Sequence, residues 1–184
     1  WEALGEEFGI AIAVPVGKRL PVNESAWQLN THADSYQDID FINAIINDIG
    51  ESHPLDDKKI YAVGYSLGSM FSYELACQMS DQFAAIASIS GLMSDWALDN
   101  CNPPKPVGVI ILHGTSDDTR PYEGIDDFSL SVDEEIQFWT DFNNTDSIPQ
   151  ITNFNDGNLI EHFKYSNGTN GSLVELYKIN NGYH

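Results

Sequence analysis

Apolar residues recur at two different spacings along the chain, and the alternation between these spacings predicts both helices and strands. Between Gln37 and Ile49, isoleucines recur every three or four positions, which is the spacing of one buried helix face. Residues 67–79 are compatible with a second helix, and a capping-box sequence from Ser131 to Glu134 begins a third. Runs that are apolar or that alternate predict strands at residues 9–16, 60–63, 84–90, 107–112, 160–165 and 173–179.

This order of strands and helices favours an α/β fold with a mostly parallel sheet and helices on both faces. No linker-like stretch divides residues 1–184, so we expect one domain. Residues 18–34 show no period and contain turn-forming residues, which predicts a loop. Residues 1–8 look like the end of a helix leading into the strand at 9–16. We therefore expect an N-terminally incomplete domain, with any signal peptide upstream of Trp1.

The composition is strongly acidic, with 28 Asp and Glu residues against 8 Lys and Arg residues and a formal net charge of −20. Such a charge disfavours binding to a phosphate backbone, so nucleic acid is not an expected partner. No run approaches the roughly 18 apolar residues that a membrane span needs, so a membrane is not an expected partner either. The pattern leaves the oligomeric state open.

One dense group of acidic residues could suggest a metal site. Its members are Asp126, Asp127, Asp133, Glu134 and Glu135. The group lacks the ligand spacing and turn glycine of a calcium loop, so we expect a solvent-exposed face and helix N-terminus instead. We also expect His113 to form a local hydrogen bond rather than bind a metal. No metal and no cofactor is therefore predicted.

The two cysteines, Cys77 and Cys101, permit at most one internal disulfide. A disulfide requires their Cα atoms to lie about 4.4–6.8 Å apart, which sequence does not determine. The alternative is a pair of small, buried apolar side chains.

The stretch Gly64-Tyr65-Ser66-Leu67-Gly68 has the form G-x-S-x-G and lies where the strand at 60–63 gives way to the helix at 67–79. On a sharp turn from strand to helix, a serine hydroxyl is exposed, and glycines allow the two backbones to approach closely. The alternative is an ordinary glycine-rich turn with an incidental serine. The strand before and the helix after favour a nucleophile.

An acid and a histidine follow the serine in the chain. Asp117 lies just after the strand at 107–112, where loops at the carboxyl ends of parallel strands line active sites. Asp118 is the alternative acid, and both aspartates could instead simply stabilise a tight turn. His184 follows the last strand. Serine, acid and histidine in this order are typical of an α/β-hydrolase triad.

These residues, together with the stretches GIAIAVPVG, KKIYAVGYSLGSM, FAAIASISG, CNPPKPVGVIILHGTSDDTRPYEG and NNGYH, resemble α/β-hydrolase esterases of the polyhydroxybutyrate depolymerase and feruloyl esterase type. The resemblance covers nearly the whole chain. In that family HGTxD followed by PYxG carries the acid, which implies Asp117, and a glycine-then-histidine ending implies His184. The family often has Asn-Gly-Gly where this chain has Leu67-Gly68-Ser69, and its second oxyanion donor comes from an earlier strand that we expect upstream of Trp1.

The resemblance implies a serine carboxylic-ester hydrolase acting on polymer-derived or plant-wall esters, either hydroxyalkanoate or feruloyl, in an extracellular or periplasmic setting. Ser66 would be the nucleophile, His184 the base and Asp117 the acid, with the Leu67 N–H in the oxyanion hole. Two alternatives stay open. One is a peptidase or thioesterase using the same triad, and the other is a catalytically inert domain of this fold.

Overall fold

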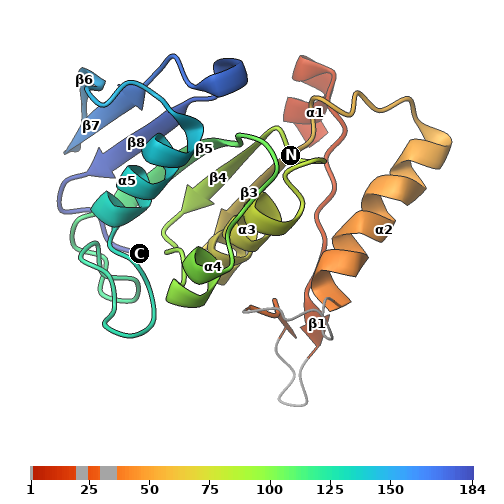
Figure 1. Cartoon of the computed structure of the whole chain (residues 1–184), viewed down its shortest axis with the longest axis horizontal. Helices are drawn as coiled ribbons and strands as arrows, with labels where there is room; N and C mark the ends of the chain where they lie inside the picture. Colours follow the sequence, from red (N-terminus) through yellow and green to blue (C-terminus); the bar gives the residue numbers. More distant parts are fainter. Residues whose placement is uncertain (1, 20–24, 30–36) are drawn as a thin grey trace.

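A six-stranded mixed sheet forms the centre of the protein (Figure 1). The structure, a computed structural model, describes residues 2–19, 25–29 and 37–184. In sheet order the strands are β3 (Tyr61–Tyr65), β4 (Ala85–Ile89), β5 (Gly108–Gly114), β8 (Val174–Ile179), β7 (Asn158–Tyr165) and β6 (Gln150–Asp156). The first four are mutually parallel, whereas β7 pairs antiparallel with β8, and β6 pairs antiparallel with β7. The mostly parallel sheet predicted from sequence is therefore confirmed, and β6 is a strand that the prediction lacked.

Three helices cover one face of this sheet and build the main core. They are α3 (Leu67–Gln78), α4 (Asp95–Asp99) and α5 (Val132–Asn143). Tyr73 of α3 and Trp139 of α5 pack in one cluster with Ile86 of β4 and Val109 of β5. The ring centroids of Tyr73 and Trp139 lie 6.3 Å apart. Because α3 directly follows Ser66, this core fixes the helix on which the serine motif ends.

A second, smaller core joins α2 (Gln37–Ser52) to α3. Ile39 and Ile42 of α2 pack in this cluster with Phe71 and Leu75 of α3. The helix predicted from the isoleucine spacing is confirmed, although it continues to Ser52 rather than ending before the glycine at position 50. The buried face that the spacing predicted is the one that contacts α3.

The strand predicted at residues 9–16 is wrong. After α1 (Glu2–Phe8) these residues form an irregular segment without strand pairing, and Ile10, Val14 and Val16 are exposed (Figure 1). An apolar run becomes a buried strand only if a neighbouring strand and covering layers accept it. No described strand pairs with this segment. The run has the composition of a strand without the tertiary partners.

The predicted loop at residues 18–34 contains a short antiparallel pair between β1 (Lys18–Arg19) and β2 (Ser25–Ala26). The rest of that prediction falls partly on residues 20–24 and 30–34, which lie outside the described residues, as does Trp1. Trp27 follows β2, and its ring stacks on Phe71 of α3 with centroids 4.8 Å apart. This contact brings the segment after β2 against the helix that follows Ser66.

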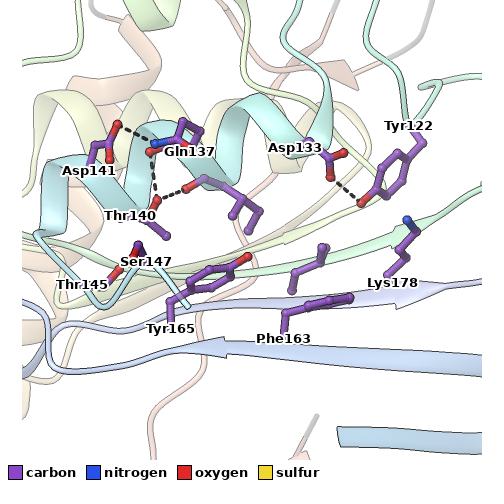
Figure 2. Close-up of a pocket in the computed structure, with 12 residues that line it drawn as sticks. Tyr122, Asp133, Gln137, Thr140, Asp141, Thr145, Ser147, Phe163, Tyr165 and Lys178 are labelled. Atoms are coloured by element: carbon purple, nitrogen blue, oxygen red, sulfur yellow. Dashed lines mark hydrogen bonds between the residues drawn. The ribbon is translucent and has the colours of Figure 1, made fainter. Parts of the chain in front are cut away.

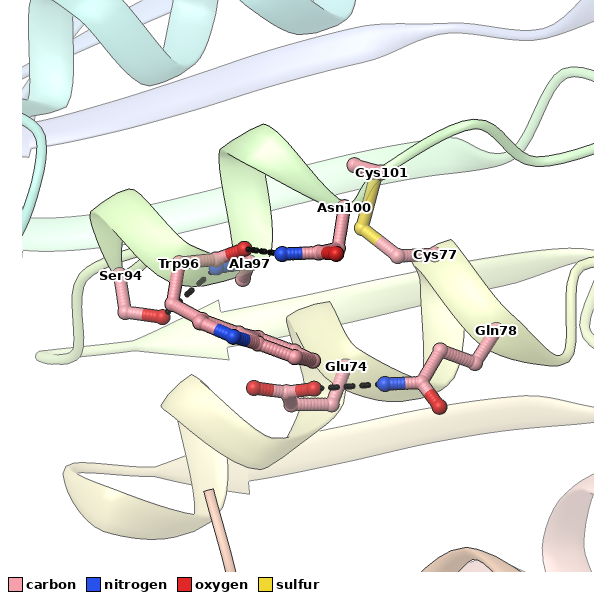
Figure 3. The surroundings of a disulfide bond; sticks show 8 residues. All are labelled: Glu74, Cys77, Gln78, Ser94, Trp96, Ala97, Asn100 and Cys101. Carbon is pink, nitrogen blue, oxygen red and sulfur yellow. Dashed lines mark hydrogen bonds between the residues drawn. A yellow bond between two sulfur atoms is a disulfide. The ribbon is translucent and has the colours of Figure 1, made fainter. Parts of the chain in front are cut away.

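Cys77 and Cys101 form a disulfide, with their Cα atoms 4.7 Å apart (Figure 3). Cys77 lies on α3, and Cys101 follows α4, whose N-cap is Ser94. The bond closes a loop with a sequence separation of 24 residues. By the chain-entropy model, a loop of this length stabilises the fold by about 3 kcal/mol. The disulfide therefore ties the segment after β4 to α3.

The capping box at the start of α5 is confirmed, because the Ser131 hydroxyl accepts from the Glu134 N–H and the Glu134 carboxylate accepts from the Ser131 N–H. The expectation that the acidic group lies in solvent holds for Asp133 and Glu134 but is wrong for Glu135, which is fully buried. Glu135 lies on the core side of α5 because the core residues Val132 and Trp139 are three positions before it and four positions after it on the same helix face.

Within the described residues, no helix is both long and apolar enough to span a bilayer. The same residues contain no group of three or more His, Cys, Asp or Glu side chains arranged to hold a metal ion.

Candidate active site

Ser66 lies on the turn that joins the end of β3 to α3, in a backbone conformation that non-glycine residues rarely adopt (φ 52°, ψ −117°). Its N–H donates to the carbonyl of Ile89 at the end of β4 (2.8 Å), and its carbonyl accepts from the N–H groups of Ser69 and Met70. Strained conformations of this kind persist only where the surrounding structure fixes them. The turn therefore has the geometry of a nucleophile elbow.

The two glycines of the motif have different roles. A Cβ atom at Gly64 would overlap the carbonyl of Gly68, so the close approach of β3 and α3 requires glycine at this position. A Cβ atom at Gly68 would only meet Trp27, at 3.8 Å. Gly64 thus permits the sharp turn, while Gly68 supplies the backbone that Gly64 approaches.

Asp117 is buried near the start of the loop that follows β5, with a relative exposure of 5%. Its Oδ1 atom accepts from the N–H groups of Thr119 (2.9 Å) and Arg120 (2.7 Å). Burial alone would raise the pKa of Asp117, but these hydrogen bonds and the one with His184 outweigh it and hold the pKa below its usual value. The alternative acid, Asp118, is exposed, and its carboxylate accepts from the Thr119 hydroxyl at the long distance of 3.4 Å.

The His184 imidazole lies between Ser66 and Asp117. Its Nε2 atom is 2.9 Å from Ser66 Oγ, and its Nδ1 atom is 2.8 Å from Asp117 Oδ2. The partners define the tautomer, since Nδ1–H donates to the carboxylate and Nε2 is left to accept from the serine hydroxyl. The exposed ring of Tyr65 lies beside the imidazole, with ring centroids 5.1 Å apart. The structure thus brings together the three side chains that the sequence analysis named.

Backbone contacts hold the loop that carries Asp117 against the loop that carries His184. The Ser116 N–H donates to the Gly182 carbonyl (2.9 Å), and the Asn181 N–H donates to the Thr115 hydroxyl (2.9 Å). A Cβ atom at Gly114 would overlap Gly182, so the two backbones touch. Sequence reasoning missed these contacts. The glycine that follows His113 and the one that precedes Tyr183 were the available signals.

His113 supports the loop that carries Asp117 from its buried side. It is fully buried, and its Nε2–H donates to the Arg120 carbonyl (2.7 Å). Burial lowers the pKa of His113, more than the Arg120 carbonyl and the nearby Asp117 raise it. The 3.7 Å separation between His113 Nε2 and Asp117 Oδ2 is therefore a contact with a neutral ring rather than an ion pair. The predicted local hydrogen bond of His113 is confirmed.

Leu67 is the first residue of α3. The first N–H groups of a helix have no acceptor within the helix and point beyond its N-terminus. This end of α3 also carries the positive pole of the helix dipole, which favours negative charge beside Ser66.

A cavity of about 380 Å³ lies elsewhere, between α5 and strands β7 and β8 (Figure 2). Tyr122 and Lys178 line one end of it, and the Lys178 ammonium is 4.8 Å from the centroid of the Tyr122 ring. Tyr165 and Thr145 also line it. No member of the Ser66, Asp117 and His184 group contributes to its wall, so this cavity is separate from the candidate active site.

Several curated proteins resemble the chain in sequence, although no protein-family model matches it. Feruloyl esterase B of Piromyces equi is 29% identical over 118 residues, which are 63% of this chain and 22% of that protein. The bifunctional acetylxylan esterase/xylanase XynS20E of Neocallimastix patriciarum is 28% identical over 128 residues, which are 70% of this chain and 18% of that protein. The chain therefore spans less than a quarter of the length of either relative.

Among solved structures, an acetyl xylan esterase from Aspergillus awamori superimposes with a TM-score of 0.63 at 14% sequence identity. The match covers 99% of this chain and 75% of that one. At this sequence identity, the match is evidence for the fold alone. The chain is thus similar in sequence to named feruloyl and acetylxylan esterases, and it shares its fold with the acetyl xylan esterase from Aspergillus awamori.

Proposed function

We propose that the protein hydrolyses carboxylic esters, with Ser66 as nucleophile, His184 as general base and Asp117 as the acid that orients it. The observation that carries this proposal is the pair of hydrogen bonds from His184, 2.9 Å to Ser66 Oγ and 2.8 Å to Asp117 Oδ2. The three residues lie on loops at the carboxyl ends of β3, β5 and β8, the edge of the sheet at which such folds bind substrates. No cofactor is needed for this chemistry.

In the first half of the reaction, Ser66 Oγ attacks the ester carbonyl carbon while His184 Nε2 takes the hydroxyl proton. The tetrahedral intermediate then collapses, and the same proton passes from Nε2 to the leaving alcohol. In the second half, water attacks the acyl-enzyme carbonyl carbon and gives a proton to His184 Nε2. Collapse of the second tetrahedral intermediate then releases the carboxylic acid, and the proton passes from Nε2 to Ser66 Oγ. The Asp117 carboxylate holds the imidazole in the required tautomer and stabilises the imidazolium in both halves.

The negative charge that develops on the carbonyl oxygen needs donors beside Ser66. We assign one of them to the Leu67 N–H, because Leu67 begins the helix that follows the nucleophile. A donor of this kind is worth about 2.7–4 kcal/mol of transition-state stabilisation. The dipole of α3 acts in the same direction.

We propose plant-wall esters, feruloyl or acetyl groups on polysaccharide, as the substrate class. The support is the pair of relatives named for feruloyl and acetylxylan ester hydrolysis. Secretion to an oxidising compartment fits the same function, because the disulfide between Cys77 and Cys101 would persist there.

The test is turnover of p-nitrophenyl acetate, methyl ferulate and acetylated xylan by the purified protein and by the Ser66→Ala variant. We expect hydrolysis by the wild type and a loss of at least about 10³-fold in kcat for the variant, with an unchanged circular dichroism spectrum. Equal turnover by both proteins would remove Ser66 from its role. A folded wild type that hydrolyses none of the three esters would favour a catalytically inert domain.

A further inference from the structure

A buried network of hydrogen-bonded polar side chains lies beneath the nucleophile elbow, and the proposed reaction does not explain it. Its members are Ser69 and Tyr73 of α3, Ser88 of β4, Glu135 of α5, and the backbone of Met93. All five residues are fully buried. Polar groups in a core reduce stability unless they are hydrogen-bonded, and an apolar replacement of similar size is often neutral or stabilising. Stability alone therefore does not explain why this polar network is buried here.

One arm of the polar network reaches the elbow through α3. The Tyr73 hydroxyl donates to Glu135 Oε2 (2.7 Å) and also hydrogen-bonds Ser88. The Ser88 hydroxyl lies 2.5 Å from the hydroxyl of Ser69. Ser69 belongs to the first turn of α3, and its N–H donates to the Ser66 carbonyl (3.0 Å). This arm therefore ends on the backbone of the nucleophile.

The other arm reaches the elbow through the segment after β4. The Met93 N–H donates to Glu135 Oε1, which fixes this segment from its far end. Nearer the elbow, a Cβ atom at Gly91 would lie 2.5 Å from the Ser66 carbonyl oxygen, which is too close for any side chain. The backbone of this segment therefore packs directly against the backbone of the elbow. Ser90 has a positive φ of 49° beside Ser66 at 52°. Each side of this contact therefore carries a residue with positive φ, Ser66 in the elbow and Ser90 next to Gly91.

We propose that Glu135 is a positioning residue, which holds both backbones around Ser66 through Tyr73 and Met93 and so keeps the serine hydroxyl aligned with His184. Strained conformations at functional sites persist only where several contacts fix them. Glu135 supplies two such contacts at once, one to each arm. It touches neither the substrate nor the reacting atoms. This inference rests on the proposed function of Ser66.

Two substitutions at this position separate hydrogen bonding from packing. Glu135→Gln keeps an acceptor for the Met93 N–H and an amide group for the Tyr73 hydroxyl, whereas Glu135→Leu keeps the volume and removes both hydrogen bonds. Gln137→Ala is the matched control, because Gln137 lies two residues along the same helix and is exposed. Each variant is compared with the wild type for kcat and KM on p-nitrophenyl acetate. The rate constant and the final stoichiometry of Ser66 phosphorylation by diisopropyl fluorophosphate are measured in parallel.

We expect Glu135→Leu to lower kcat and the phosphorylation rate constant together by about 10–100-fold, with KM within about twofold and full final labelling, because a small misplacement of a nucleophile costs this much. Glu135→Gln and Gln137→Ala should stay within about threefold of the wild type. A purely structural role would instead lower the melting temperature and the labelled fraction and leave the rate per labelled site unchanged. That result for Glu135→Leu would overturn the inference.

If Glu135→Leu fails to fold, Tyr73→Phe and Ser88→Ala decide the question, since each breaks the α3 arm by removing one hydroxyl group. We expect a fall of about tenfold in the phosphorylation rate constant for either variant. Wild-type rates in both would reject the inference. A wild-type protein that diisopropyl fluorophosphate does not label would reject the proposed function instead, so the two failures are distinguishable.

Discussion

Two buried carboxyl groups, Asp117 and Glu135, lie in environments that drive their ionisation in opposite directions. Asp117 faces the imidazole of His184 and accepts from two backbone N–H groups on the same loop, so its pKa falls despite burial. Glu135 accepts from one N–H group and one phenol in the middle of the core. There burial raises the pKa of Glu135 to about 8, because the donors of Met93 and Tyr73 only partly offset it.

The difference shows that the depth of burial and the number of surrounding donors together decide whether a carboxyl group can carry a charge. The Asp117 carboxylate has three donors and lies beside the His184 imidazole, where the proposed mechanism requires a charge to stabilise an imidazolium. The Glu135 region has a phenol whose own pKa is raised well above its usual range by burial and by Glu135, so both groups stay protonated near neutral pH. Asp117 is therefore charged, whereas Glu135 is neutral and acts through its hydrogen bonds.

The largest expected effect tests the charged member of the comparison. Asp117→Asn should lower kcat by about 10⁴-fold, because an amide no longer selects the tautomer of His184 that can accept from Ser66. Asp118→Asn is the matched control, since this neighbour is exposed and lies away from the imidazole. Its kcat on p-nitrophenyl acetate should stay within about twofold of the wild type. The opposite result, with the larger loss at Asp118, would give the acid role to that residue.

The second prediction concerns the pH dependence of stability. The Glu135 carboxyl has a higher pKa in the folded protein than in the unfolded chain, so its contribution is fully present below about pH 4.3 and is lost as the pH rises toward 8. Within this window, the wild type should lose up to about 1.4 kcal/mol per pH unit relative to Glu135→Gln. Urea unfolding of both proteins at several pH values measures the difference.

Asp117 contributes with the opposite sign. The pKa of this carboxyl is lower in the folded protein, so its contribution is present above about pH 4 and is lost as the pH falls through the folded-state value. The difference between the wild type and Glu135→Gln cancels this term, since both proteins keep Asp117. Parallel unfolding curves from pH 5 to pH 8 would show that Glu135 ionises normally, and the contrast between the two carboxyl groups would then be lost.

The sequence predicted one side of this comparison and not the other, for a physical reason. Ser66, Asp117 and His184 each follow a strand at a turn with its own local chemistry, so short stretches of sequence identify them. Glu135 is one of three consecutive acidic residues at a helix start, and the same local pattern describes exposed and buried positions alike. Only the packing of α5 on the sheet puts Glu135 in the core.

The errors in the fold prediction have the same cause. Periodicity identified α2 and the parallel strands, because one buried face leaves a regular spacing of apolar residues. The run at 9–16 has strand-like composition but no described partner. Among the described strands, β6 pairs with β7 alone, at the sheet edge, where its residues are largely exposed. Both outcomes depend on neighbours that are distant in sequence, which a local pattern does not contain.

A third prediction separates stability from catalysis at α3, the helix that joins Ser66 to the polar network of Glu135. Replacing Cys77 and Cys101 together with alanine should lower the free energy of unfolding by about 3 kcal/mol, because the unfolded chain gains the freedom of the closed loop. The disulfide lies at the far end of α3 from Ser66, so kcat at 25 °C should change by less than about twofold. Urea unfolding and ester hydrolysis measure the two quantities. A large fall in kcat would mean that α3 does not hold the elbow independently of its C-terminal end.

The smallest expected effect comes from the N-cap of α5. Ser131→Ala removes the hydroxyl that accepts from the Glu134 N–H and should cost about 1 kcal/mol of stability. Because Trp139 and Glu135 still anchor α5 in the core, kcat should be unchanged. Thermal unfolding with parallel assays on p-nitrophenyl acetate provides the comparison, and Ser131→Thr, which keeps a capping hydroxyl, is the control. If Ser131→Ala reduced kcat as strongly as Glu135→Leu, the effect of either substitution would come from loosening α5 as a whole. The hydrogen bonds of Glu135 to Tyr73 and Met93 would then have no separate role in aligning Ser66.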